Sequence, residues 1–397
     1  MLADAFVLAV RNLKQRLLRS GLTALGIIIG VTAIVAIFLI SDGLENAITT
    51  QFEEIGSNTL FVLPGSGIMA GQLQQGLTQE DVDTIEKASE VENVLGYLYE
   101  SGDITYGREE IFFQYIAGIE PDNVEEKISA IGLDLAEGRW FSDNEKLSVV
   151  VGSNVVEDIF DKSLGLKNRL TIKEKKFEIV GVMEEIGNNQ DDSVVYMPLD
   201  TMYELFDKED ELSFISLKVK QGFDPDAVAS KLERMMEKKR GNDRFEVWTS
   251  AQTLEIFGSI LIIIQVVLGG IAAISLLVGA LGIMNSMFTA VMERTKEIGI
   301  MKSVGATNKE ILSIFLFEAG LLGLGGGVIG ITLGYLISLW VSAAASSAGY
   351  SIFLIQFKPS IAIIGLGFAG GVGILSGLWP AWNAAKLHPV DALRDKK

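Results

Sequence analysis

The sequence lacks cysteine altogether and contains a single histidine, His388. These two absences exclude a disulfide framework, a thiolate metal site and a histidine-rich metal centre. Neither GxxxxGKS nor GxxxxGKT occurs, so this sequence provides no P-loop for ATP. GxSxG and HExxH are absent too, and no acidic loop has the alternating spacing of an EF-hand. We therefore predict no catalytic residue, no metal site and no cofactor bound by this chain.

Charge is missing from long parts of the chain and concentrated in others. Apolar residues make up 49% of the 397, more than is usual in a soluble domain. Residues 42–255 contain 20 basic and 44 acidic residues, a balance of −24, whereas the rest contains 13 and 7, a balance of +6. Small acidic clusters at 109–110, 191–192 and 209–211 are predicted to be solvated acidic faces. The uneven charge indicates an acidic block flanked by segments in lipid.

Four uncharged stretches are long enough to cross a bilayer, which requires about 20 mainly apolar residues. They cover residues 20–41, 256–292, 319–342 and 359–385. An earlier start of the third stretch, near Ile311, would place Glu318 inside it. The second stretch would form a helix of about 55 Å, against about 30 Å of hydrocarbon. We expect it to project beyond the membrane as a stalk.

Basic residues gather at three places that four helices would bring to one side of the membrane. The positive-inside rule makes that side the cytoplasm, with both termini there and residues 42–255 outside. Residues 1–19 are predicted to form an amphipathic helix on the inner leaflet. An uncharged run of 22 residues without a small-x-small site favours an uncleaved anchor over a signal peptide. The basic residues are Arg11, Lys14, Arg16 and Arg19, then Arg294, Lys296, Lys302 and Lys309, then Lys386, Arg394, Lys396 and Lys397.

Glycines recur at four-residue spacing within the predicted spans. Small residues on one stripe of a helix allow membrane helices to approach closely. We predict helix packing rather than a substrate path at Gly326, Gly330, Gly334, Gly367, Gly371, Gly373 and Gly377.

The acidic block has the pattern of a mixed α/β domain. Short strands are predicted at "NTLFVLPG", "LSVVVGS", "KKFEIVGVM", "SFISLKVK" and "FEVWTSAQ". One helix is predicted to begin after Thr78, and another after Asp224 with Pro225 as its first residue. The fold class is therefore four transmembrane helices with a large mixed α/β domain between the first and second.

The segment "ERTKEIGIMKSVGATNKE", residues 293–310, interrupts two apolar runs with charge. Thr307 and Glu310 form a capping-box pattern, so the third span begins there. The residues before Gly305 suit either a polar turn or a short helix that docks on a soluble partner. Taken as a helix, they place Arg294, Glu297 and Met301 on one side. The pattern alone leaves both alternatives open.

The chain resembles the MacB-like ABC transporter permeases, a superfamily that includes lipoprotein-releasing permeases and FtsX-like proteins. The resemblance is strongest in "IMNSMFTAVMERTKEIGIMKSVGATNKEILSIFLFEAGLLGLGGGVIGITLG" and continues in "GLWPAWNAAKLHPVDALR". In the acidic block, "GRWFSDNEKLSVVVGSNVVEDIF", "FEIVGVM" and "SVVYMPLDT" are similar to the family's periplasmic core domain. The resemblance implies a multi-pass protein of the cell membrane.

The resemblance also implies partners and a mechanism. Two copies of a separate ATPase, which use ATP and Mg, would bind a permease homodimer or a heterodimer with a close relative. The cytoplasmic segment would be a coupling helix that contacts the ATPase. ATP-driven movement would pass through the stalk to the outer domain, which is called mechanotransmission. The implied coupling residues are Glu293, Arg294, Lys296, Glu297, Ile298, Gly299, Ile300, Lys302 and Gly305.

The predicted function is that of a non-catalytic permease subunit that exports or extracts an amphipathic molecule, lipoprotein or peptide. The alternative is an FtsX-like protein that signals to an extracytoplasmic partner without translocation. Glu318 is predicted to make a polar contact inside the helix bundle. We expect no nucleic acid partner. The predicted segments are 1–19, 20–41, 42–255 with an inserted subdomain at about 140–212, 256–292, 293–307, 308–342, 343–358, 359–381 and 382–397.

Overall fold

The computed structural model describes residues 17–65, 76–350 and 353–393. Residues 1–16 of the predicted amphipathic helix therefore lie outside the described residues. The end of the predicted tail, residues 394–397, lies outside them as well. The described residues divide into two compact units. The helical unit contains residues 17–45, 259–344 and 354–393, and the α/β unit contains 46–258 and 345–353.

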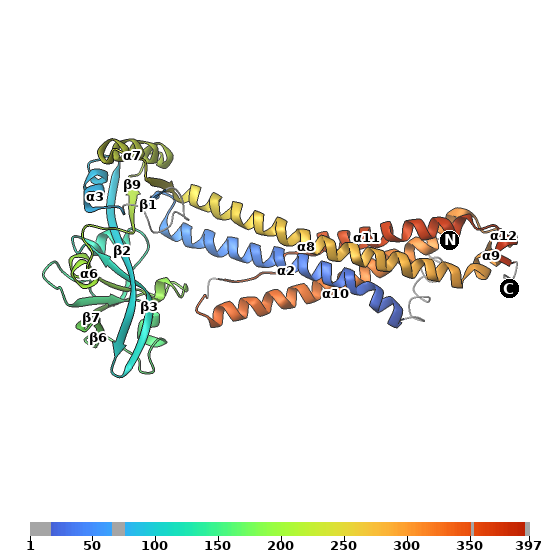
Figure 1. Cartoon of the computed structure of the whole chain (residues 1–397), viewed down its shortest axis with the longest axis horizontal. Coiled ribbons are helices and arrows are strands. Elements are labelled where there is room, and N and C mark those ends of the chain that lie inside the picture. The colour runs from blue at the N-terminus through green and yellow to red at the C-terminus, as the bar shows by residue number, and fades with distance from the viewer. Residues whose placement is uncertain (1–16, 66–75, 351–352, 394–397) are drawn as a thin grey trace. The chain divides into compact units, whose positions relative to one another are not determined.

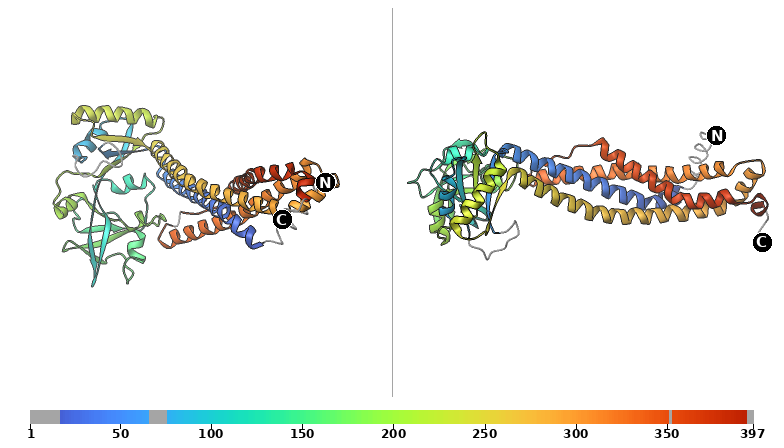
Figure 2. Two further views of the ribbon diagram at one scale, coloured as in Figure 1. Left: turned by 45° about the vertical axis from the view of Figure 1, so that its right-hand side comes forward. Right: turned by 90° about the horizontal axis from the view of Figure 1, so that it is seen from above.

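The helical unit contains four long helices that run alongside one another, as Figures 1 and 2 show. Within the described residues, each of the four is long and apolar enough to span a membrane, which confirms the predicted spans. They begin earlier or end later than the uncharged runs, because a helix continues past the lipid into water. The helices are α2 (Leu17–Ile55), α8 (Ser250–Glu293), α10 (Asn308–Ser347) and α11 (Pro359–Lys386), joined by the short α9 (Thr295–Ser303) and followed by α12 (Pro389–Leu393).

Glycines on α10 form two stripes that face two different helices. A Cβ atom on Gly330 would lie 2.8 Å from the Cβ of Val31 on α2, and one on Gly334 would lie 2.9 Å from a carbonyl oxygen of α2. On another face, a Cβ on Gly323 would lie 2.3 Å from the carbonyl oxygen of Ala369 on α11. These helices therefore pack with their backbones almost in contact, which is how membrane helices associate without a hydrophobic driving force.

The predicted glycine stripes agree with the structure only in part. Gly326, Gly330 and Gly334 pack against α2, and Gly373 and Gly377 pack against α10. A Cβ atom on Gly367 or Gly371 would meet no atom of the described residues within 4 Å, so helix packing at these two positions stays a prediction. Sequence reasoning missed Gly26, which abuts the Cα atom of Gly279 on α8, although Gly26 and Gly30 share the same four-residue spacing.

Substitution of Gly323 by alanine is expected to lower stability much more than substitution of Gly371. The new methyl group at 323 would overlap a carbonyl oxygen of α11, which cannot move without shifting a helix. Overpacking of this kind costs about 1–3 kcal/mol. Gly371→Ala is a matched control because it meets open space, and alanine favours helix over glycine by about 1 kcal/mol. Thermal unfolding of the detergent-purified protein measures both, and equal losses would contradict this packing.

The α/β unit is built on one ten-stranded mixed sheet. All five strands predicted from the sequence are present, as β1, β5, β7, β9 and β10. Along the sheet the order is β10-β1-β9-β2-β3-β8-β5-β7-β4, with β6 bonded to β2 and β7. The strands are β1 (Thr59–Pro64), β2 (Val91–Tyr106), β3 (Glu109–Ile119), β4 (Leu135–Gly138), β5 (Ser148–Val151), β6 (Arg169–Ile172), β7 (Lys175–Met183), β8 (Val195–Pro198), β9 (Phe214–Val219) and β10 (Phe245–Thr249).

Helices cover parts of this sheet and share its core. Leu60 and Val62 of β1 lie in the same buried cluster as Ile85 and Leu232, which come from two helices. The predicted stretch at 140–212 contains β5 to β8, which belong to the same sheet because β6 is bonded to β2 and β8 to β3. The helices are α3 (Gln79–Glu86), α4 (Val124–Ser129), α5 (Ser153–Glu157), α6 (Leu199–Phe206) and α7 (Pro225–Arg240), with a 3₁₀ turn at Asp191–Ser193.

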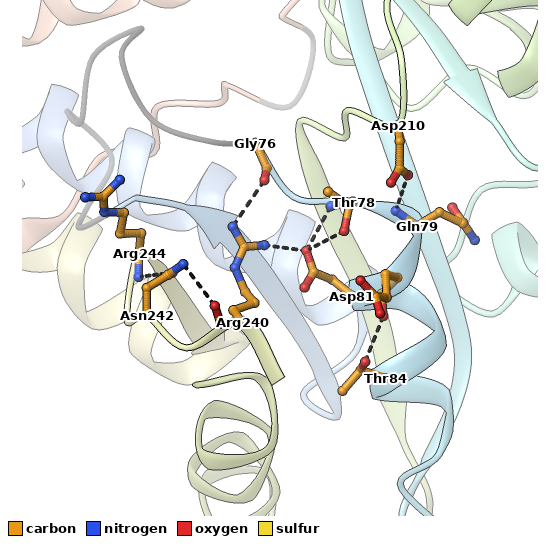
Figure 3. Close-up of polar contacts among 10 residues, drawn as sticks. Gly76, Thr78, Gln79, Asp81, Thr84, Asp210, Arg240, Asn242 and Arg244 are labelled. Atoms are coloured by element: carbon orange, nitrogen blue, oxygen red, sulfur yellow. Dashed lines mark hydrogen bonds and ion pairs between the residues drawn. The ribbon is translucent and has the colours of Figure 1, made fainter. Parts of the chain in front are cut away.

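The two predicted helix starts are confirmed at α3 and α7. Asp81 accepts hydrogen bonds from the backbone N–H of Thr78 (2.8 Å) and from its hydroxyl (3.2 Å). Arg240, the last residue of α7, forms a buried ion pair with the same carboxylate, and Figure 3 shows its guanidinium reaching the Gly76 carbonyl as well. A capping residue of one helix thus joins the end of the other helix.

Candidate coupling site

The charged segment at 293–310 contains a helix of its own rather than only a turn. α8 ends at Glu293, and α9 begins one residue later with Arg294 at its N-cap position. Gly305 then has a φ of +107°, a conformation that favours glycine, so its role is to turn the chain. The predicted capping box follows: Glu310 accepts from the Thr307 N–H (2.7 Å) and donates its own N–H to the Thr307 hydroxyl (3.3 Å).

One face of α9 is anchored to the helical unit. Ile298 and Gly299 are buried, and α12 packs against this helix. The Lys302 ammonium donates to the carbonyl oxygens of Ala385 and Leu387, at 2.7 Å each. These carbonyls close the end of α11, where unpaired C=O groups and the helix dipole favour a cation. α9 is therefore held to the end of the fourth membrane helix.

A buried ion pair anchors the other end of α9. The Arg294 guanidinium lies 3.2 Å from the Glu318 carboxylate on α10, and their side chains are only 12% and 8% exposed. The expected polar contact of Glu318 inside the bundle is thus present, and its partner comes from the charged segment. Because unpaired charges are costly away from water, the pair fixes the position at which α9 leaves α8.

The opposite face of α9 is exposed and chemically mixed. Lys296 and Glu297 point to solvent together with Ile300, and Val304 just after the helix is 85% exposed. The described residues leave this mixed face uncovered, on a helix whose other side is fixed.

The predicted coupling residues therefore fall into two groups. Glu293, Lys296, Glu297, Ile300 and Gly305 are exposed, whereas Ile298 and Gly299 are buried and Arg294 and Lys302 bind inside the helical unit. The prediction placed Arg294 on one side with Glu297 and Met301. The structure adds that Arg294, Ile298 and Lys302, at spacings of four, all contact the helical unit. That spacing was the signal in the sequence, and it was missed because the buried face here includes two cations.

Within the α/β unit, the ends of two long helices are tied to the sheet at one place. The Ser250 hydroxyl at the start of α8 donates to the carbonyls of Gly56 (3.2 Å) and Thr59 (2.9 Å), just after α2. Phe52 of α2 packs edge-on to Phe61 of β1, with centroids 6.2 Å apart. These contacts hold the ends of α2 and α8 against the sheet.

A second contact joins α2 to a loop before β8. The Gln51 amide donates to Asp191 (3.3 Å), as does the Asn188 amide (2.8 Å). Burial, and then the neighbouring Asp192 carboxylate, raise the pKa of Asp191 to about 6. Asp192 is itself buried and accepts two backbone N–H groups of this loop. The prediction of a solvated acidic face was therefore wrong for these two residues.

Comparison with known proteins identifies the class of molecule that carries this arrangement. Residues 20–235 match the MacB-like periplasmic core domain, and residues 269–389 match the FtsX-like permease C-terminal domain. The chain belongs to the MacB/FtsX-like family of ABC transporter permeases. Membership implies a membrane setting and a partner ATPase.

Relatives match nearly the whole of this chain. A protein of Methanocaldococcus jannaschii named as an uncharacterized ABC transporter permease is 36% identical, over 98% of this chain and 98% of its own. The macrolide export ATP-binding/permease protein MacB of Bdellovibrio bacteriovorus is 32% identical over 97% of this chain, which spans 60% of that relative's length. The solved periplasmic region of MacB from Actinobacillus actinomycetemcomitans is 20% identical, over 53% of this chain and 97% of that one, with a TM-score of 0.47.

Proposed function

We propose that the protein is the non-catalytic permease subunit of an ATP-driven transporter in the cell membrane, with both termini in the cytoplasm. Two copies of a separate ATPase, which bind ATP and Mg, would dock on α9 of two permease copies. The second permease would be another copy of this chain or a close relative. The observation that carries this proposal is the geometry of α9, which is fixed by Arg294 and Lys302 on one side and exposed on the other.

The mechanism that we infer is mechanotransmission. Because α9 is fixed at both ends and packed elements shift as units, a movement of the ATPase would displace α8 and α10 together with α9. At the far ends of α2 and α8, Ser250 and Phe52 connect the helices to the sheet. Movement of the outer domain would then export or extract an amphipathic molecule, lipoprotein or peptide. The ATPase would hydrolyse ATP, and this chain would transmit the resulting movement to the α/β unit.

Reconstitution in liposomes tests the proposal. The permease would be combined with a candidate ABC ATPase from the same organism, and fluorescent lipopeptides would be screened for stimulated hydrolysis and for release from the vesicles. We expect both effects with at least one amphiphile. If hydrolysis responds to an extracytoplasmic enzyme and to no amphiphile, transport is wrong and the FtsX-like signalling function replaces it. No response of hydrolysis to the permease itself would refute the coupling.

A further inference from the structure

One edge of the sheet is left open in the middle of the α/β unit. β3 pairs with β2 from Glu109 to Ile119, but on its other side β8 pairs only with Ile116–Ile119. Among the described residues, no strand bonds to residues 109–115 on that side. In an antiparallel pair, every second residue directs its N–H and C=O away from the partner strand. The first half of β3 thus presents unpaired backbone groups at a free edge.

A pocket of about 300 Å³ runs along this edge. Five consecutive residues of β3, from 111 to 115, line it, with Ile159, Gln190 and Tyr350 opposite. Successive side chains of a strand point to opposite faces, so a pocket lined by five in a row follows the edge and not a face. The free backbone groups therefore border an empty pocket, whose remaining wall includes Ile159, Gln190 and Tyr350.

The edge has few of the features that normally protect a free strand. Residues 111–115 read Ile-Phe-Phe-Gln-Tyr and include neither a charged residue nor proline, which are common blocks to edge pairing. Phe112 is 64% exposed, and Tyr350 across the pocket is also exposed. A short apolar strand of this composition is a hazard for aggregation unless something covers it. The strand therefore has the character of a binding edge.

Charge next to the pocket indicates what would cover it. β3 begins with Glu109 and Glu110, and Asp103 lies opposite Phe112 on β2. The backbone N–H of Asp161 already binds the Glu109 carboxylate (3.0 Å), which places a further acidic residue at this end. Residues 42–255 as a whole have a balance of −24. An approaching chain would be favoured by positive charge and opposed by negative charge.

We propose that the free edge of β3 binds an extended basic polypeptide segment by β-augmentation. The segment would extend the sheet through main-chain hydrogen bonds and would place one aromatic or aliphatic side chain in the pocket beside Phe112 and Tyr350. Lysine or arginine residues of the bound segment would face Glu109 and Glu110 at the start of β3. This binding surface concerns the α/β unit and does not depend on the coupling proposed for α9.

Binding of defined peptides to the full-length, detergent-purified protein tests this proposal. The probe is a fluorescein-labelled heptapeptide, Lys-Val-Lys-Phe-Lys-Val-Lys, followed by fluorescence anisotropy. One comparison peptide carries N-methyl groups on alternate residues, which remove the donors along one edge, and another carries glutamate in place of lysine. We expect saturable binding of the probe, about tenfold weaker binding of the N-methylated peptide and none of the acidic peptide.

Two variants of the protein complete the test. Phe112→Ser is expected to weaken probe binding about tenfold, because it removes the exposed aromatic wall of the pocket without disturbing the core. Phe223→Ser is the matched control, since Phe223 is 48% exposed and does not line the pocket. Equal binding of the N-methylated peptide, or equal losses in both variants, would overturn the proposal. So would self-association of the free protein that Phe112→Ser abolishes, because a second copy would then occupy the edge.

Discussion

Glu297→Lys is expected to abolish stimulation of the partner ATPase while the protein stays folded in the membrane. Glu297 lies on the exposed face of α9, so reversal of its charge leaves the helix and its anchors intact. A like charge brought against a docking surface costs several kcal/mol, which would reduce a coupled complex by orders of magnitude. The measurements are copurification of the ATPase and hydrolysis in liposomes with and without the permease.

A second substitution and a control separate docking from folding. Gly299→Pro interrupts α9 from its buried side, which costs about 3 kcal/mol or more, and should uncouple the ATPase through loss of the helix itself. Glu237→Lys makes the same charge change on an exposed face of α7 and should leave hydrolysis unchanged. If Glu297→Lys copurifies and stimulates like the control, α9 is not the docking surface.

The removal of Glu318 is expected to be strongly destabilising for the helical unit. Glu318→Ala leaves the Arg294 guanidinium buried without its carboxylate, and loss of one partner of a buried pair costs about 3–5 kcal/mol. The expected result is a large fall in the unfolding temperature of the detergent-purified protein. Loss of coupling should accompany it, because Arg294 no longer fixes the start of α9.

A double-mutant cycle distinguishes this ion pair from a general need for either residue. Arg294→Met with Glu318→Leu replaces both charges by apolar groups, and a buried pair replaced in this way is often neutral or stabilising. We therefore expect the double variant to be more stable than the single variant Glu318→Leu, which leaves Arg294 without its carboxylate. If the double variant loses as much as the sum of its single changes, the two side chains do not act as a pair.

The fold class followed from the sequence because lipid imposes simple rules. A span must be long and uncharged, so the four helices could be recognised from composition alone. Strands such as β5 and β7 were clear from β-branched runs between turn residues, and Thr78 and Thr307 from the chemistry of helix starts. Each of these signals is local, so a single sequence is enough to detect it.

The errors have a common physical cause, which is that tertiary partners decide how charges are used. Asp191 and Asp192 read as a solvated cluster, but backbone N–H groups and the Gln51 amide satisfy them in a buried loop. For Arg294 and Lys302 the sequence predicted coupling residues, and the structure adds that a carboxylate and a helix terminus of the same chain bind them. Gly367 and Gly371 have the spacing of packing glycines, but that spacing alone does not show which helix lies opposite, so their packing stays a prediction.

The first and last strands of the α/β unit are neighbours in the sheet. β1 starts four residues after α2 ends, β10 runs directly into α8, and the two pair antiparallel from Leu60 with Thr249 to Pro64 with Phe245. The chain thus enters the α/β unit from α2 through β1 and leaves it to α8 through β10, and these two strands are paired. A different domain with adjacent termini could be spliced in at this point, and the membrane machinery would not need to be redesigned. An insertion whose two ends leave as paired neighbours requires only that its first and last strands match, whatever the rest of its fold.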